Sequence, residues 1–191
     1  MTARWVVDEV APKRDLHLIW QPISLLFKND PDPASDYYRG VHRGHQALRI
    51  MEAVRADHGE AKVHDWYFQC GTRLHHDGDR AFEFADALAT IGVDPSLADA
   101  ADDTRWDREI STRMDAGLEL VGNDVGTPII AFTCDDGTKR GIFGPVITRV
   151  PDTEISLRFW DAMVVFITTD GFWELKRTRT TRPEFGDRPA V

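Results

Sequence analysis

Residues 122 to 133 read Gly-Asn-Asp-Val-Gly-Thr-Pro-Ile-Ile-Ala-Phe-Thr, and this stretch separates a helical part of the chain from a β-rich part. Two β-rich runs follow it, Ala131 to Thr133 and Arg140 to Ile147, joined by the turn signal Asp135-Asp136-Gly137. Proline has no N–H and fits only the first residue or the edge of a strand. An X-Pro bond is also the only peptide bond with an appreciable cis population. We therefore predict that Thr127-Pro128, through a cis bond, shapes a site at the point where the helical region ends and the sheet begins.

Composition narrows the classes of function. A chain of 191 residues is long enough for one domain or for a core with a sizeable insertion. Its formal net charge of −9 argues against non-specific binding to nucleic acid, which needs a basic face. No run of about 18 apolar residues occurs, so no transmembrane helix is predicted, and the first residues lack the order typical of a signal peptide. We expect a cytoplasmic protein with neither a nucleic-acid nor a membrane partner.

The order of predicted elements is α-β, then a block of helices, then β-β-α. Apolar spacing over residues 3–14 indicates a helix. The run from Leu16 to Leu26 is rich in β-formers and predicts a buried strand. A helix is expected over about 152–167, and one last helical turn over 172–176. The helices predicted between them cover about 36–56, 61–74, 79–91, 95–101 and 103–121, the first with Ser35 or Asp36 as its N-cap.

That order resembles a thioredoxin fold with a helical insertion, as in the DsbA-like thioredoxin family. Five runs are similar to the actinobacterial branch that includes the mycothiol-dependent reductases, also described as nitroreductases. These runs are Thr2-Ala-Arg-Trp5, Pro22-Ile-Ser-Leu25, Asp124-Val-Gly-Thr-Pro128, Phe143-Gly-Pro-Val146 and Phe172-Trp-Glu-Leu-Lys-Arg-Thr-Arg179. The resemblance extends from Thr2 to about Phe185. It implies an α/β protein with a thioredoxin-like core at 1–30 and 123–178, a helical insertion at 31–122 and a tail at 179–191.

The sequence departs from the family at one point. There, a first strand leads into a Cys-Pro-x-Cys or Cys-Pro-x-Ala motif at the start of the first helix, where the helix dipole favours the attacking thiolate. Here the sequence begins at Met1, inside the corresponding helix, so the first strand and the motif are missing. Either Met1 is an internal methionine of a longer protein, or the gene product is short and is a binding module or a degenerate relative. The first is favoured, because losing a central strand leaves buried backbone groups unpaired at about 1–3 kcal/mol each.

The resemblance implies a thiol site at Gly126, Thr127 and Pro128, where the residue before the proline offers its backbone to a bound peptide or thiol cofactor. It also implies that Asn29 and Tyr38 line this site. An amide and a phenol can hydrogen-bond a sugar-like thiol or a nitro-bearing substrate. A loop cap and a half-buried tyrosine explain these two residues equally well. No residue of the chain itself is assigned as catalytic.

Cysteines and histidines supply no alternative centre. Cys70 lies among aromatic neighbours, which favour the neutral thiol, and Cys134 lies beside acidic residues, so neither is expected to replace the missing motif. His42 and His45 share a helical spacing, and His75-His76-Asp77 is a compact donor group. A zinc site needs a third or fourth ligand, which no obvious spacing supplies. We predict solvated histidines and no metal.

Three functions remain open. The first is an oxidoreductase that uses mycothiol or another low-molecular-weight thiol to reduce disulfides or nitroaromatic compounds, with its catalytic cysteine upstream of Met1, so that this chain alone is inactive. The second is a binding module that holds a thiol at the Thr127-Pro128 face without turnover. The third is a glutathione-transferase or isomerase-like enzyme. Phe172 and Trp173 are expected to serve a homodimer or to dock the tail.

Overall fold

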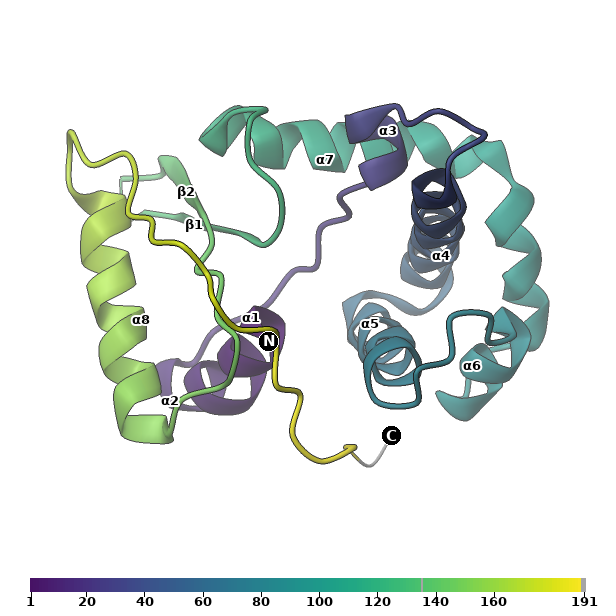
Figure 1. Cartoon of the computed structure of the whole chain (residues 1–191), viewed down its shortest axis with the longest axis horizontal. Helices are drawn as coiled ribbons and strands as arrows, with labels where there is room; N and C mark the ends of the chain where they lie inside the picture. The colour runs from purple at the N-terminus through teal and green to yellow at the C-terminus, as the bar shows by residue number, and fades with distance from the viewer. Residues whose placement is uncertain (135, 190–191) are drawn as a thin grey trace. The chain divides into compact units, whose positions relative to one another are not determined.

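The computed structural model describes residues 1–134 and 136–189 (Figure 1). Over these residues the protein is mixed α/β and mostly helical, with one small antiparallel sheet of two strands. The helical elements are α1 (Thr2–Arg4), η1 (Trp5–Val10), α2 (Ala11–Arg14), α3 (Leu25–Asn29), α4 (Asp36–His58), α5 (Glu60–His75), α6 (Phe84–Thr90), η2 (Pro95–Asp102), η3 (Thr104–Trp106), α7 (Asp107–Val121) and α8 (Thr153–Thr168), and the strands are β1 (Ile129–Thr133) and β2 (Lys139–Phe143).

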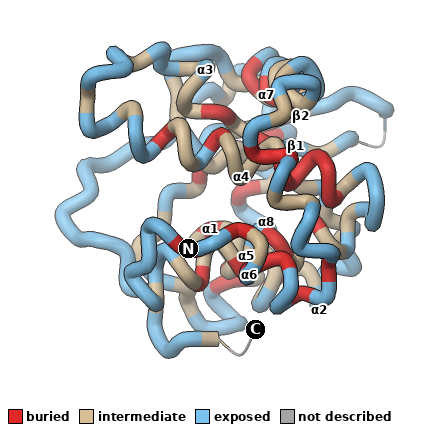
Figure 2. The backbone as a smooth tube through the Cα atoms, turned by 90° about the vertical axis from the view of Figure 1, so that its right-hand side faces the viewer, coloured by how far each residue is buried: buried red, intermediate tan, exposed pale blue. Residues whose placement is uncertain are grey.

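The chain forms two compact units. Unit 1 combines Met1–Leu18 with Ala116–Gly186, and unit 2 combines Ile19–Asp115 with the end of the chain from Asp187. Each unit has its own apolar cluster. Figure 2 shows buried positions alternating with exposed ones along the helices, as expected for amphipathic helices that each cover a core.

Unit 1 is built on the first helical run and the hairpin. The predicted helix at 3–14 is confirmed as the continuous run α1, η1 and α2, in which η1 is a π-helix. Ile129 of β1 pairs with Phe143 of β2 in an antiparallel register. Helix α8 lies beside both elements (Figure 1). The buried apolar residues among them are Trp5, Val10, Met163 and Ile167.

Unit 2 is a set of helices around an apolar core. Helix α4 begins at Asp36, and its N-cap is Ser35, one of the two residues predicted for this role, whose hydroxyl accepts the N–H of Tyr38. The indole of Trp66 on α5 is buried and donates its N–H to the carbonyl of Ala47 on α4 at 3.0 Å. Buried residues of α6 and η2 complete the core, and the largest fully buried apolar side chains here are Ile50, Trp66 and Leu88.

Two predicted elements are wrong. Residues 16–24 are irregular rather than a strand, and Leu25 begins α3. A strand needs a neighbour to bond its backbone, and among the described residues no strand pairs with this run. The last helical turn expected at 172–176 is also absent, because α8 ends at Thr168 and Gly171 adopts a left-handed φ of 79°. The turn signal at 135–137 is described only in part, since Asp135 lies outside the described residues.

Candidate functional site

Thr127-Pro128 lies in unit 1, directly before β1. The bond between them is cis, which confirms the sequence prediction. Thr127 is exposed, whereas Gly126 and Pro128 are half-buried. The carbonyl of Pro128 accepts the N–H of Gly144 at 2.8 Å, so the proline is tied to the end of β2. Thr127 is therefore an exposed residue directly before a proline that is anchored to β2.

The outer edge of β1 continues from this turn. Hydrogen bonds to β2 alternate along an antiparallel strand, and the bonds at Pro128 and Cys134 place the inward-facing groups at even positions. The N–H and C=O groups of Ile129, Ala131 and Thr133 consequently point away from β2. Within residues 1–134 and 136–189, no other strand pairs with this edge. An open edge of this kind can accept an extended chain.

Asn29 and Tyr38 lie in unit 2. Asn29 is the last residue of α3, and its side-chain amide donates to the hydroxyl of Tyr37 at 2.5 Å. Tyr38 is half-buried and stacks on His42, with ring centroids 5.4 Å apart. The structure thus joins Asn29 to the neighbouring tyrosine, which sequence reasoning did not single out. The implied site residues fall into two groups, one in each unit.

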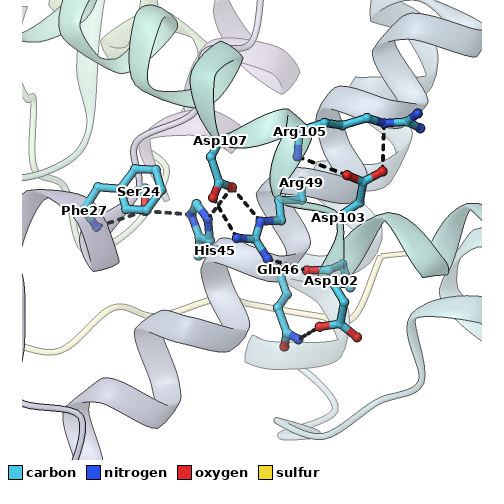
Figure 3. Close-up of polar contacts among 10 residues, drawn as sticks. Ser24, Phe27, His45, Gln46, Arg49, Asp102, Asp103, Arg105 and Asp107 are labelled. Atoms are coloured by element: carbon cyan, nitrogen blue, oxygen red, sulfur yellow. Dashed lines mark hydrogen bonds and ion pairs between the residues drawn. The ribbon is translucent and has the colours of Figure 1, made fainter.

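A buried polar network anchors α3 to α4 and α7 (Figure 3). Ser24 Oγ lies 2.9 Å from His45 Nδ1, and His45 Nε2 lies 3.0 Å from Asp107 Oδ1. Arg49 donates two hydrogen bonds to the same carboxylate, at 2.6 and 2.8 Å. The prediction that His45 is solvated is wrong, because its side chain is 1% exposed. Its spacing of four residues from Arg49 on α4 is the one sequence signal that could have suggested a shared interior face.

The hydrogen-bond partners of His45 determine which of its ring nitrogens carries the proton. A carboxylate accepts only, so His45 Nε2 must carry the proton that faces Asp107, and Nδ1 is left to accept the hydroxyl of Ser24. Burial lowers the pKa of His45, and the hydrogen bond to Asp107 opposes this shift only in part. Burial would raise the pKa of Asp107, but the hydrogen bonds from Arg49 and His45 outweigh it and lower that pKa. The network therefore holds a neutral imidazole between a hydroxyl and an ion pair.

A Ser-His-Asp order also occurs in nucleophilic catalysis, but access excludes that role here. Ser24 is 1% exposed, and its Oγ already accepts the N–H of Phe27 at 3.2 Å as the N-cap of α3. A substrate carbonyl cannot reach this oxygen without unpacking the helix. The network has a structural role: it fixes α3 against α4 and α7.

The chain matches the family model described as Rv2466c-like, mycothiol-dependent nitroreductase Rv2466c, over residues 1–177. The protein belongs to this family. The match confirms the resemblance inferred from the five sequence runs.

Cys70 is unsuited to the thiolate chemistry that a mycothiol-dependent nitroreductase family implies. Burial raises the pKa of the Cys70 thiol to about 12, as its aromatic neighbours predicted, so it stays protonated at neutral pH. Cys134 is half-buried and forms no disulfide. In the part of the chain that the structure describes, no group of three His, Cys, Asp or Glu side chains is placed to hold a metal ion. No helix among the described residues is long and apolar enough to cross a membrane.

A hollow of about 400 Å³ lies beside α7 in unit 2. Its lining includes the buried carboxylate of Glu52, which Arg55 and Arg113 approach to 3.0 and 3.2 Å. Glu109 takes a second ion pair from Arg113 at 2.8 Å. These guanidinium groups are engaged by carboxylates of the chain itself.

Proposed function

We propose that the protein is a DsbA-like oxidoreductase that uses mycothiol, or another low-molecular-weight thiol, to reduce a disulfide or a nitro compound in the cytoplasm. The observation that carries this proposal is the family match over residues 1–177. Two thiols that join as one disulfide supply two electrons and two protons. These reduce one disulfide to two thiols, or one nitro group to a nitroso group with release of water. The match does not favour the transferase or isomerase alternative.

We place the thiol at Gly126, Thr127 and Pro128 of unit 1, and we propose Asn29 and Tyr38 of unit 2 as polar groups that bind a ligand. Two observations support this. Thr127 is exposed beside the open edge of β1, so its backbone is available to a ligand. Asn29 is exposed and its amide is held by Tyr37, which leaves the amide oxygen to accept a hydroxyl group.

We propose that the attacking cysteine precedes Met1 and that residues 1–191 alone are inactive. Cys70, with a pKa of about 12, supplies no thiolate. In this proposal a thioredoxin-like core covers 1–30 and 123–178. Residues 31–122 form the helical insertion and those from 179 the tail in this proposal.

The test compares residues 1–191 with a version extended at the N-terminus to include any upstream Cys-Pro motif. Reduction of a nitroaromatic reporter is followed with mycothiol as the reductant. The extended protein should turn over and the shorter one should not. Equal activity in both would show that the nucleophile lies within residues 1–191.

Binding is measured separately on residues 1–191 by tryptophan fluorescence. The variant Asn29→Ala should weaken mycothiol binding about fivefold, the value of one net hydrogen bond. Thr112→Ala is the matched control, because Thr112 is exposed on α7 and its hydroxyl bonds only its own helix, at 2.9 Å from the carbonyl of Arg108. Identical weakening in both variants would remove Asn29 from the site.

A second candidate is a thiol-binding module without turnover, which the raised pKa of Cys70 favours. In that case both lengths of the protein bind mycothiol and neither turns over.

We also propose a homodimer formed through the extended segment after α8, where Trp173 and Leu175 are 88% and 74% exposed. Sedimentation of the wild type against Trp173→Ala tests it, and an unchanged monomer in both would exclude the dimer.

A further inference from the structure

Helix α3 depends on its surroundings for its direction. It has only five residues, Leu25–Asn29, and a helix this short is not stable by itself in water. Its first turn is closed by the Ser24 hydroxyl, which accepts the N–H of Phe27 at 3.2 Å. Its last residue, Asn29, is followed by Asp30 in a left-handed conformation with φ 39°. The segment is thus a capped helix of about one and a half turns, and contacts with neighbouring elements must stabilise it.

His45 holds the beginning of this segment in two ways. Its Nδ1 lies 2.9 Å from Ser24 Oγ, and its ring packs on the ring of Phe27 with centroids 4.3 Å apart. Ser24 is buried, so the hydroxyl has no water to replace His45 as a partner. The imidazole therefore fixes both the cap of α3 and the side chain of its third residue.

His45 is itself fixed from the opposite side (Figure 3). Its Nε2 lies 3.0 Å from Asp107 Oδ1, and Asp107 is held by both Nε and a terminal nitrogen of Arg49. The same guanidinium donates to the carbonyl of Ala101 at 3.0 Å. The ring is thereby joined to α4, η2 and α7, the packed part of unit 2, and it links this frame to α3.

We propose that His45 is a positioning residue, which acts through Ser24 to orient α3 and so places the side chain of Asn29 for ligand binding. This inference rests on the proposed function for the role of Asn29. At the far end of α3 the amide of Asn29 reaches Tyr37 at 2.5 Å, and Tyr37 is on α4, the same helix as His45. Both ends of α3 are therefore hydrogen-bonded to side chains of one helix, α4. A change at His45 tilts the segment about its attachment at Tyr37.

The hydrogen bonds require a neutral ring. With the proton on Nε2, this N–H donates a hydrogen bond to Asp107. The Ser24 hydroxyl then donates to Nδ1 and still accepts the N–H of Phe27. A protonated ring would donate at both nitrogens, and the Ser24 proton would be left buried without this acceptor. The charged and titratable groups that face the ring are Asp107, Arg49 and His42. Arg49 already neutralises Asp107, so the carboxylate gives a second positive charge little support.

Two substitutions at this position separate the contacts. His45→Asn places an amide near the position of Nδ1 and keeps a partner for Ser24. His45→Gln reaches the position of Nε2 and keeps the donor to Asp107 while releasing Ser24. Both variants leave a smaller side chain in the core, so their loss of global stability should be similar. The difference between them reports which hydrogen bond is kept, the one to Ser24 or the one to Asp107, rather than packing: faster exchange of α3 in His45→Gln than in His45→Asn assigns the effect to Ser24.

Three quantities are measured on residues 1–191: the free energy of unfolding, amide hydrogen exchange of Phe27 and Lys28, and the Kd of mycothiol. We expect His45→Gln to exchange faster at these amides and to raise the Kd about fivefold, the effect of one net hydrogen bond. His45→Asn should stay closer to the wild type in both. Equal exchange and equal Kd in the two variants would overturn the proposal. If His45→Gln does not fold, Ser24→Ala replaces it in the Kd comparison only, because losing the cap bond to Phe27 speeds exchange whether or not His45 holds α3.

The proposed function fails separately. If the wild type does not bind mycothiol, the site assignment is wrong, and hydrogen exchange still decides whether His45 holds α3. If mycothiol binds but Asn29→Ala has no effect while His45→Gln speeds exchange, then His45 orients α3 but does not place a ligand group, which contradicts the proposal.

Discussion

Arg49 donates two hydrogen bonds to the carboxylate of Asp107, at 2.6 and 2.8 Å, and the two side chains are 11% and 27% exposed. A guanidinium fits a carboxylate with two parallel donors, whereas the ammonium of lysine offers one compact charge. We expect Arg49→Lys to lower the free energy of unfolding by about 1–3 kcal/mol, because a partly buried charge loses its paired donors. Urea unfolding measures this change.

The matched control is Arg39→Lys. Arg39 pairs with Asp36 three residues away on α4, but the two side chains are 76% and 92% exposed. An exposed pair contributes at most about 1 kcal/mol, and often much less. Equal destabilisation by the two lysine variants would mean that the Asp107 contact adds nothing beyond a surface pair.

Stability should fall in mild acid because of His45. Burial lowers the pKa of His45 below its ordinary value of 6.5. As the pH falls below about 6.5, the unfolded chain takes up a proton that the folded protein still excludes, so the unfolded state is favoured. The stability contributed by the neutral ring is present above this pH and is lost toward the lower pKa of the folded state.

Comparing the free energy of unfolding at about pH 7 and pH 5 tests this, since an unperturbed histidine titrates between them. The loss of stability should be smaller in His45→Gln than in the wild type. Some loss should remain, because burial also lowers the pKa of His75. His17→Gln serves as control at an exposed position and should keep the full loss. An unchanged loss in His45→Gln would show that His45 is not responsible.

Cys70 should be inert toward thiol reagents in the folded protein. Burial raises its pKa to about 12, and only the thiolate reacts. Cys70 and Cys134 are the only cysteines of the sequence, so the variant Cys134→Ala reports Cys70 alone. We expect negligible reaction with an aromatic disulfide reagent near pH 8 until urea unfolds the protein. Rapid reaction of the folded variant would reopen Cys70 as a candidate nucleophile.

Local signals in the sequence were sufficient where the structure depends on neighbours along the chain. Ser35 caps α4 with its own hydroxyl, and Thr127-Pro128 precedes β1 in the cis form that its sequence predicted. Gly137 takes the left-handed φ expected in the hairpin turn. Each of these features is decided by a few adjacent residues.

Features that depend on distant partners were missed. Leu16 to Leu26 has the composition of a strand, but a strand forms only against a neighbour, and Ser24 instead caps a helix. His45 was expected at the surface because its partner Asp107 is far along the chain on another helix. Phe172 returns to stack on Phe166 at 4.9 Å after the left-handed turn at Gly171, so the expected helical turn gives way to this contact.

Gly141 on β2 should not tolerate a side chain. A Cβ there would lie 3.1 Å from Leu120 Cβ and 3.4 Å from the carbonyl oxygen of Ile130, and neither can move freely. We expect Gly141→Ala to destabilise by about 1–3 kcal/mol, as overpacking does. Gly117→Ala on α7 meets nothing within 4 Å and should stabilise by about 0.5–1 kcal/mol through helix propensity. Thermal unfolding of both variants decides it: a stabilised Gly141→Ala would mean that β2 does not approach the end of α7 this closely.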